Sequence, residues 1–278
     1  MKKVLGLTLL AALGAFVVFM TGCIPPSEVP TPTGLTVEAT ADGAGVKLTW
    51  NAVTVEGEDV TYDIYFEGAL LEFGEAIEVT YYEDADPGKA GEYEVIAVAG
   101  GEESEPAEIS TKPIAVAPLE GWDINASGES GITFNVAGKA IVTHSMGATG
   151  TKRDEVDFYF TNWAGLSAGF EGPYYLASAH KVNDDPGDPD PGYTDWRTTG
   201  ISDELGGNIE STTIVPTTSD PDNKYYYDIT EELVINGVYA ISTQDDYFGI
   251  VQVTNIDETD GGVEFKATFQ PIKGLRLF

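Results

Sequence analysis

The chain has 278 residues and a formal net charge of −32, from 14 Lys and Arg against 46 Asp and Glu. This acidity argues against nucleic acid as a partner, because contacts with phosphates need a basic face. Hydrophobic residues make up 42% of the chain and aromatic residues 11%, which excludes a disordered protein. The length suffices for two domains of ordinary size.

The N-terminus has the layout of a secretory signal, with Lys2 and Lys3 before an uncharged apolar run over residues 4–20. The run ends in Met20-Thr21-Gly22-Cys23, which resembles the lipobox of bacterial lipoproteins with Met in place of the usual Leu. The resemblance implies removal of residues 1–22 and acylation of Cys23, with palmitate among the acyl groups. Cys23 is the single cysteine, so no intramolecular disulfide is expected. The alternative is an uncleaved anchor helix.

Residues 23–33 contain four prolines and predict an extended polyproline II spacer. At about 3.1 Å per residue it would span roughly 30 Å. A lipid at Cys23 would hold the chain on a membrane, and the spacer would lift the first domain off the surface. We therefore expect a cell-envelope protein that faces the periplasm or the cell exterior.

From Gly34 on, apolar and polar residues alternate in short runs separated by turn sequences such as Asp42-Gly43 and Gly100-Gly101. This pattern predicts an antiparallel β-sandwich. Residues 32–35, 48–50, 62–65, 91–98 and 103–106 resemble strands A, B, C, F and G of a fibronectin type III domain, in that order. The resemblance implies an immunoglobulin-like fold over residues 34–113, with Trp50 in the core and Tyr93 at a tyrosine corner. We expect this module to act as a spacer and interaction platform.

Residues 114–278 predict a larger antiparallel β-sandwich or open barrel of about 8 to 10 strands, by the same alternation. Runs over residues 238–242, 247–253 and 263–269 predict a three-strand meander with a turn at Gln244-Asp245-Asp246. A short helix is predicted at residues 202–205 or 229–233. The runs at 238–243 and 247–253 also resemble the C-terminal strands of haemophore-like surface lipoproteins. The expected fold class of the whole chain is all-β.

Residues 182–196 hold five aspartates: Asp184, Asp185, Asp188, Asp190 and Asp195. Short carboxylates in a turning loop can converge on calcium, which takes six to eight oxygen ligands. The spacing is not that of an EF-hand, and Asp-Pro-Gly is also an ordinary turn sequence. Calcium is thus the candidate cofactor, and a solvated loop is the alternative.

Aromatic residues surround this acidic segment. We predict a ligand platform from Trp163, Tyr174, Tyr175, Tyr193 and Trp196, because sugar rings stack their C–H faces on Trp and Tyr. The alternative for each ring is packing in the β core.

Catalytic motifs are weak or absent. The sequence has no Gly-x-Ser-x-Gly, phosphate-loop or His-Glu-x-x-His pattern, so we expect no enzyme activity. The two histidines, His144 and His180, could serve as axial ligands of a haem, but His144 falls in a strand pattern where a satisfied, half-buried histidine is commoner.

The leading functional hypothesis is a membrane-anchored surface lipoprotein with a non-catalytic role, binding a polysaccharide or another envelope protein. A structural envelope spacer without a small ligand is the main alternative. An envelope glycan hydrolase and a haem carrier are further alternatives. Exposure of Trp163 and Trp196 in a concave face would favour ligand binding over the structural role.

Overall fold

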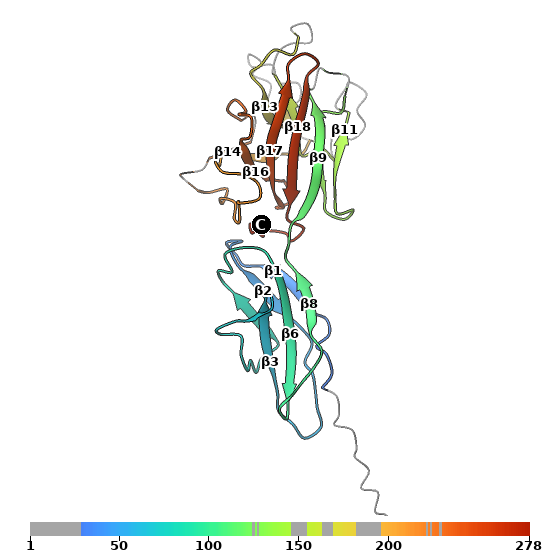
Figure 1. The fold of residues 1–278 in the computed structure, drawn as a ribbon, viewed down its shortest axis with the longest axis vertical. Coiled ribbons are helices and arrows are strands. Elements are labelled where there is room, and N and C mark those ends of the chain that lie inside the picture. Colours follow the sequence, from blue (N-terminus) through green and yellow to red (C-terminus); the bar gives the residue numbers. More distant parts are fainter. Residues whose placement is uncertain are drawn as a thin grey trace, which may run out of the picture.

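The computed structural model describes residues 29–123, 126, 128–145, 155–162, 169–181, 196–220, 222, 224–227 and 230–278. These residues form two β-sandwiches stacked end to end (Figure 1). The all-β prediction is confirmed, since the 3-10 turn η1 (Ala179–Lys181) is the one helical element in the described part of the chain. Within it, no helix is long and apolar enough to span a membrane.

The first sandwich contains eight strands. They are β1 (Thr36–Ala39), β2 (Val46–Thr49), β3 (Val60–Phe66), β4 (Ala69–Leu70), β5 (Tyr81–Asp84), β6 (Glu92–Ala99), β7 (Glu102–Glu103) and β8 (Ala107–Ser110). One sheet has the order β1-β2-β5, and the other has the order β4-β3-β6-β7 with β8 also paired to β6. This is the arrangement expected from the resemblance to fibronectin type III domains.

Trp50 and Tyr93 lie in the core of the first sandwich, as predicted. Trp50 is 3% exposed and packs edge-on against Tyr62, with ring centroids 5.2 Å apart. Tyr93 is fully buried, and its hydroxyl donates a 2.8 Å hydrogen bond to a carboxylate oxygen of Asp84. Because this bond reaches from β6 to the end of β5, it ties the two sheets together.

The second sandwich begins at Ile114, after the short connection 111–113. Its strands are β9 (Ile114–Trp122), β10 (Gly131–Asn135), β11 (Ala140–His144), β12 (Phe158–Thr161), β13 (Tyr175–Ser178), β14 (Gly200–Glu204), β15 (Tyr225–Tyr226), β16 (Val238–Ser242), β17 (Phe248–Asp257) and β18 (Gly262–Phe269). A four-stranded sheet of order β11-β10-β12-β13 faces a six-stranded sheet of order β15-β14-β16-β17-β18-β9. The predicted meander is β16-β17-β18.

The core of this sandwich lies between the two sheets and is rich in phenylalanine. Phe134 of β10 stacks on Phe269 of β18 at 5.3 Å and meets Phe158 edge-on at 5.6 Å. Both sheets are also covered on their outer faces. Trp196 packs with Val156 and Tyr159 outside the four-stranded sheet, whereas a second cluster around Val215 and Phe248 covers the six-stranded one.

The predicted short helix is wrong at residues 202–205, where β14 occupies Gly200–Glu204. The strand pairs with β15 and β16, and its residues Gly200, Ile201 and Ser202 are buried. Burial between two strands favours the extended backbone here over local helix propensity. Of the other predicted helix, Ile229 lies outside the described residues and Thr230–Leu233 is irregular, with the Thr230 amide donating to the Leu176 carbonyl.

The C-terminal segment (residues 271–278) returns to the junction of the two sandwiches, where the label C stands in Figure 1. Leu275 and Leu277 are fully buried in the core of the first sandwich. The segment approaches the backbone at Gly43 so closely that a Cβ there would lie 2.2 Å from the Gly274 carbonyl oxygen. Gly43 also has φ +72°, which favours glycine. The first sandwich thus takes part of its core from the far end of the chain.

Backbone and side-chain bonds join this segment to both sandwiches. The Arg276 amide donates to the Gly43 carbonyl (2.9 Å), and its Nε donates to the Asp42 carbonyl (2.8 Å). On the other side, the Val215 amide donates to the Arg276 carbonyl and the Phe278 amide donates to the Thr213 carbonyl. The segment is therefore shared between the two domains.

Candidate functional site

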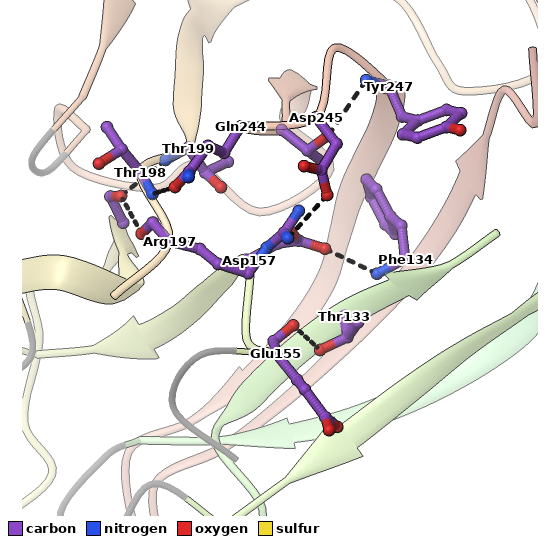
Figure 2. A network of polar contacts seen from close by, with 12 residues as sticks. Thr133, Phe134, Glu155, Asp157, Arg197, Thr198, Thr199, Gln244, Asp245 and Tyr247 are labelled. Atoms are coloured by element: carbon purple, nitrogen blue, oxygen red, sulfur yellow. Dashed lines mark hydrogen bonds and ion pairs between the residues drawn. The ribbon is translucent and has the colours of Figure 1, made fainter. Parts of the chain in front are cut away.

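A cleft of about 480 Å³ opens in the second sandwich, beside β10, β11 and the turn that joins β16 to β17. We call it the polar cleft. Its lining includes the carboxylates of Glu155, Asp157 and Asp245, the Arg197 guanidinium, the His144 imidazole, and the rings of Phe134 and Tyr247. Figure 2 shows Asp157, Arg197 and Asp245 converging from three separate parts of the chain.

Asp157 is the buried centre of the site, at 1% exposure. One of its oxygens accepts a 2.9 Å hydrogen bond from the Phe134 amide, and the other accepts a 2.7 Å bond from Arg197 Nε. The Asp157 amide in turn donates to the Ile132 carbonyl. The carboxylate is therefore fixed against β10 and has a defined position for its cation.

Arg197 links this buried carboxylate to a more exposed one. Its Nη1 lies 2.7 Å from an oxygen of Asp245, whose side chain is 56% exposed, whereas the Arg197 side chain is 20% exposed (Figure 2). A guanidinium held by two carboxylates is charge-assisted on both sides and oriented as well as neutralised. Arg197 is thus a fixed donor at the wall of the cleft.

Burial raises the pKa of Asp157, while the Arg197 charge and the Phe134 amide bond act to lower it. For Arg197, burial lowers the pKa, but the pull of Asp157 and the bonds to both carboxylates outweigh it and raise the pKa. A guanidinium stays protonated at any physiological pH. The pair is therefore an ion pair whose carboxylate depends on the arginine to remain charged.

The backbone around Arg197 is held from both sides. The Thr198 amide donates to the Gln244 side-chain oxygen (2.8 Å), and the Thr199 amide donates to Ser178 Oγ of β13 (2.9 Å). Ser178 Oγ also lies 2.9 Å from His180 Nδ1. These contacts anchor the segment before β14 to the β16–β17 turn, so the geometry of the cleft is set by backbone as well as by side chains.

The rim of the cleft offers groups suited to a polar ligand with an apolar face. Tyr247 is half-buried at the end of the β16–β17 turn, and its amide donates to Thr243 Oγ1. Glu155 is exposed, and its backbone carbonyl accepts a bond from Thr133 Oγ1 (2.8 Å). The exposed carboxylate of Asp245, the guanidinium of Arg197 and the ring of Tyr247 therefore belong to residues that line one cleft.

The predicted calcium ligands, Asp184, Asp185, Asp188, Asp190 and Asp195, all lie outside the described residues. Calcium at this segment stays a prediction. Among the described residues, no group of three or more His, Cys, Asp or Glu side chains is placed to hold a metal ion.

The predicted aromatic platform is not a single surface in the described part of the structure. Trp163 and Tyr193 lie outside it. Trp196 is 6% exposed and Tyr174 is 2% exposed, and the Tyr174 hydroxyl donates to the Phe170 carbonyl. Both rings are buried in apolar clusters. Tyr174 belongs to the core between the two sheets, and Trp196 belongs to the cluster outside the four-stranded sheet. Tyr175, on β13, is half-buried.

Of the two histidines, His144 lines the polar cleft, whereas His180 lies on η1 and contacts Ser178. The positions of the two histidines therefore do not support the haem hypothesis. His144 lies on β11, in a strand as predicted, but at 9% exposure it is buried rather than half-buried.

Sequence reasoning missed Arg197, Asp157, Asp245 and Tyr247 as site residues. The Gln244-Asp245-Asp246 run predicted only a turn, and Arg197 stood beside the more conspicuous Trp196. One available signal was scarcity, since the chain has only three arginines, at positions 153, 197 and 276. In so acidic a chain, an arginine next to a large aromatic residue such as Trp196 indicates a specific carboxylate partner.

Comparisons with known proteins bear mainly on the first sandwich. Residues 34–112 match the family model of the β-sheet domain of rhamnogalacturonan I lyases. No curated protein sequence matches the chain. An Fn3-like protein from Clostridium thermocellum is similar at 30% identity, covering 30% of this chain and 90% of that one, with a TM-score of 0.25.

Two solved structures resemble a larger part of the chain. A DUF4466 family protein from Parabacteroides merdae is 10% identical, covering 89% of this chain and 96% of that one, with a TM-score of 0.43. A rhamnogalacturonan lyase from Bacillus licheniformis is 13% identical, covering 82% of this chain and 51% of that one, with a TM-score of 0.25.

The molecule is thus an all-β protein of two antiparallel sandwiches with a polar cleft in the second. Its first sandwich is a fibronectin type III-like domain, by its strand order and by the buried aromatic residues Trp50 and Tyr93.

Proposed function

We propose that the protein is a lipid-anchored envelope protein that binds a carbohydrate in the polar cleft without catalysing a reaction on it. The observation that carries this proposal is the composition of the cleft: Arg197 held between Asp157 and Asp245, beside the half-buried ring of Tyr247. Ligand sites typically combine apolar or aromatic walls with a few convergent polar groups in a few hundred cubic ångströms.

Sugars present both kinds of surface. Their hydroxyl groups donate to carboxylates such as Asp245 and accept from a guanidinium, and their C–H faces pack on an aromatic ring such as Tyr247. Because the carboxylate and guanidinium already bind one another at 2.7 Å, the site is preorganised and loses little freedom when a ligand binds.

The family match supports the same class of ligand independently of the cleft. The model describes the β-sheet domain of rhamnogalacturonan I lyases, which are named after a polysaccharide. It matches the first sandwich rather than the second. The first sandwich would then serve as the accompanying module of a carbohydrate-binding protein.

The anchor and the location are carried by the N-terminal sequence. Met20-Thr21-Gly22-Cys23 after an apolar run supports lipidation at Cys23, and the prolines of residues 23–33 support a spacer. Replacing Cys23→Ala should abolish incorporation of an alkyne-tagged palmitate in the producing bacterium and leave the uncleaved precursor. Unchanged labelling of the variant would contradict the anchor.

Carbohydrate binding is tested with the full chain in a sugar-free polyoxyethylene detergent, against a panel of neutral and acidic polysaccharides. Tyr247→Ala should weaken binding roughly tenfold, because stacking on an aromatic ring is a main contact in such sites. Tyr81→Ala is the matched control, since this tyrosine is 51% exposed on β5 of the first sandwich. Failure to bind any polysaccharide, in millimolar calcium or in EDTA, would overturn the proposal.

A structural envelope spacer is the second candidate, and the C-terminal segment favours it. By burying Leu275 and Leu277 in one sandwich and bonding to Thr213 and Val215 of the other, the segment joins the domains at a second point besides residues 111–113. Two connections restrain bending between domains, which suits a protein that holds a fixed length.

A further inference from the structure

We infer that the polar cleft selects uncharged glycans over polyuronates, with Arg197 and Asp245 as the pair that sets this specificity. The inference rests on the proposed carbohydrate binding and adds the class of sugar. It is carried by the charge balance of the cleft and by the way Arg197 is already engaged.

Among the residues that the structure describes, carboxylates outnumber guanidinium groups in the lining of the cleft. Asp157 and Asp245 share the guanidinium of Arg197, and Glu155 adds a third carboxylate. The chain around it carries a net charge of −32. A clustered excess of one sign repels ligands of the same sign both at long range and on contact. A polymer with a carboxylate on each sugar therefore meets unfavourable charge at every approach to the cleft.

The Arg197 guanidinium does not reverse this balance. Its Nε is occupied by Asp157 and its Nη1 by Asp245, both at 2.7 Å. A uronate could make the bidentate contact that carboxylates favour with arginine only by displacing Asp245, which would then lose its own cation. The N–H groups of Arg197 outside these two contacts can instead donate to a neutral hydroxyl without breaking either bond.

Asp245 complements this donor with an acceptor. Only its Oδ2 is engaged by Arg197, and its side chain is 56% exposed. A sugar with two adjacent hydroxyls could accept from Arg197 and donate to Asp245 at the same time, because the two groups already lie side by side (Figure 2). The half-buried Tyr247 would bind the apolar face of the same ring. All three contacts suit an uncharged sugar.

The test compares neutral polysaccharides (glucan, mannan, xylan and galactan) with polygalacturonate, at low and moderate salt, using the full chain in the same detergent. We expect binding to at least one neutral polymer and at least tenfold weaker binding to polygalacturonate. Asp245→Asn should weaken neutral-glycan binding roughly tenfold, because it removes a charged acceptor. Glu210→Gln is the matched control, an exposed carboxylate paired at 2.8 Å with Lys266 outside the cleft lining.

A gain of binding provides a second and independent readout. The double variant Glu155→Gln, Asp245→Asn removes two carboxylates from the exposed part of the cleft and leaves Nη1 of Arg197 without a charged partner. Its affinity for polygalacturonate should rise several-fold at low salt, and the gain should shrink as salt increases. Glu210→Gln should give no such gain.

The outcomes separate this inference from the function on which it rests. Preferential binding of polygalacturonate that Tyr247→Ala weakens would overturn the neutral-glycan inference and leave carbohydrate binding in place. Binding of no polysaccharide would overturn both. Neutral-glycan binding that Asp245→Asn leaves unchanged would remove the assigned pair as the specificity determinant.

Discussion

The two sandwiches complete their cores in different ways. The first buries Trp50, Tyr62 and Tyr93 from its own strands but also takes Leu275 and Leu277 from the C-terminal segment. The second fills its inter-sheet space entirely from residues between Ile114 and Phe269 and covers the outer face of both sheets as well.

Because of this difference, we expect substitutions that destabilise the first sandwich to leave the cleft in the second sandwich intact. The smaller sandwich depends on residues from the far end of the chain, since its core includes Leu275 and Leu277. Gln270 Nε2 holds that end in place by donating to the carbonyls of both Thr111 and Leu277. The larger one holds the polar cleft, whose geometry rests on a buried ion pair within the domain. Truncation of Leu275 and Leu277 should therefore affect the first sandwich, and changes at Arg197 should affect the second.

The largest effect is expected from the double substitution Leu275→Ala, Leu277→Ala. Each buried leucine lost costs about 2–5 kcal/mol, so the pair removes a large part of the roughly 5–15 kcal/mol that stabilises a typical domain. Hydrogen exchange read by mass spectrometry should show peptides of β2, β3 and β6 losing protection, while β17 and β18 keep theirs.

The matched control for this pair is Val234→Ala, Ile235→Ala, which removes aliphatic side chains that are 57% and 51% exposed. It should change the exchange of neither sandwich by a measurable amount. Equal loss of protection in both sandwiches of the leucine variant would show that the two unfold as one unit. It would contradict the expectation that only the first sandwich depends on these leucines.

A somewhat smaller effect is expected in the second sandwich from Arg197→Met. Breaking a buried pair by removing one partner costs about 3–5 kcal/mol, because the Asp157 carboxylate is left without its cation. Since burial already raises the pKa of Asp157, the loss of Arg197 should raise it further. The folded state would then bind a proton more tightly than the unfolded state, so the deficit should shrink as pH falls from 7 towards 5.

Urea unfolding of Arg197→Met at the two pH values measures this deficit. The double variant Asp157→Asn, Arg197→Met serves as the control, since it leaves no buried charge and should lose the pH dependence. A deficit that is equal at both pH values would mean that Asp157 does not take up the proton, and would contradict the charge argument.

Alkaline pH should destabilise both sandwiches through buried tyrosines. Burial raises the pKa of Tyr93, and its hydrogen bond to Asp84 adds to the rise; burial also raises the pKa of Tyr225 in the second sandwich. Because the folded pKa exceeds the unfolded value of about 10, stability is complete below that pH and declines above it, by about 1.4 kcal/mol per pH unit for each such tyrosine.

Tyr93→Phe separates the first sandwich from the second in this test. At neutral pH it should cost about 1 kcal/mol for the lost bond to Asp84, and above pH ~10 its first sandwich should lose less stability than the wild type. Hydrogen exchange of β6 at rising pH provides the measurement. Identical pH profiles of variant and wild type would exclude Tyr93 as the sensitive group.

Much of the fold could be predicted because its signals are local. Alternation along residues 238–269 predicts three strands that the structure contains, and the aromatic spacing around Trp50 and Tyr93 predicts a fibronectin type III-like core. The return of Leu275 and Leu277 to that core could not be predicted, since nothing in a two-leucine pattern tells which of two sandwiches it enters. Residues 202–205 gave the wrong element because pairing with β16 overrides local helix propensity.

The site was harder to predict for the same reason. Asp157, Arg197 and Asp245 are far apart in sequence and meet only when β10, β14 and the β16–β17 turn are in place. The aromatic rings that drew attention, Trp196 and Tyr174, are large and apolar, and burial of such rings stabilises the fold more than exposure at a surface would. The acidic segment can be recognised from its composition alone, whereas the cleft depends on ion pairs between residues that are far apart in the sequence.

The smallest effect on stability is expected from Asp245→Asn, the variant with a large expected effect on binding. In its ion pair with Arg197 the Asp245 side chain is 56% exposed, and ion pairs at the surface contribute about 0–1 kcal/mol. Arg197 keeps its bond to the buried Asp157, so no buried charge loses its partner. The variant should melt within a few degrees of the wild type while its affinity for neutral glycans falls. A large fall in melting temperature would mean instead that Asp245 supports the Asp157–Arg197 pair, and the binding loss would then report on folding rather than on ligand contact.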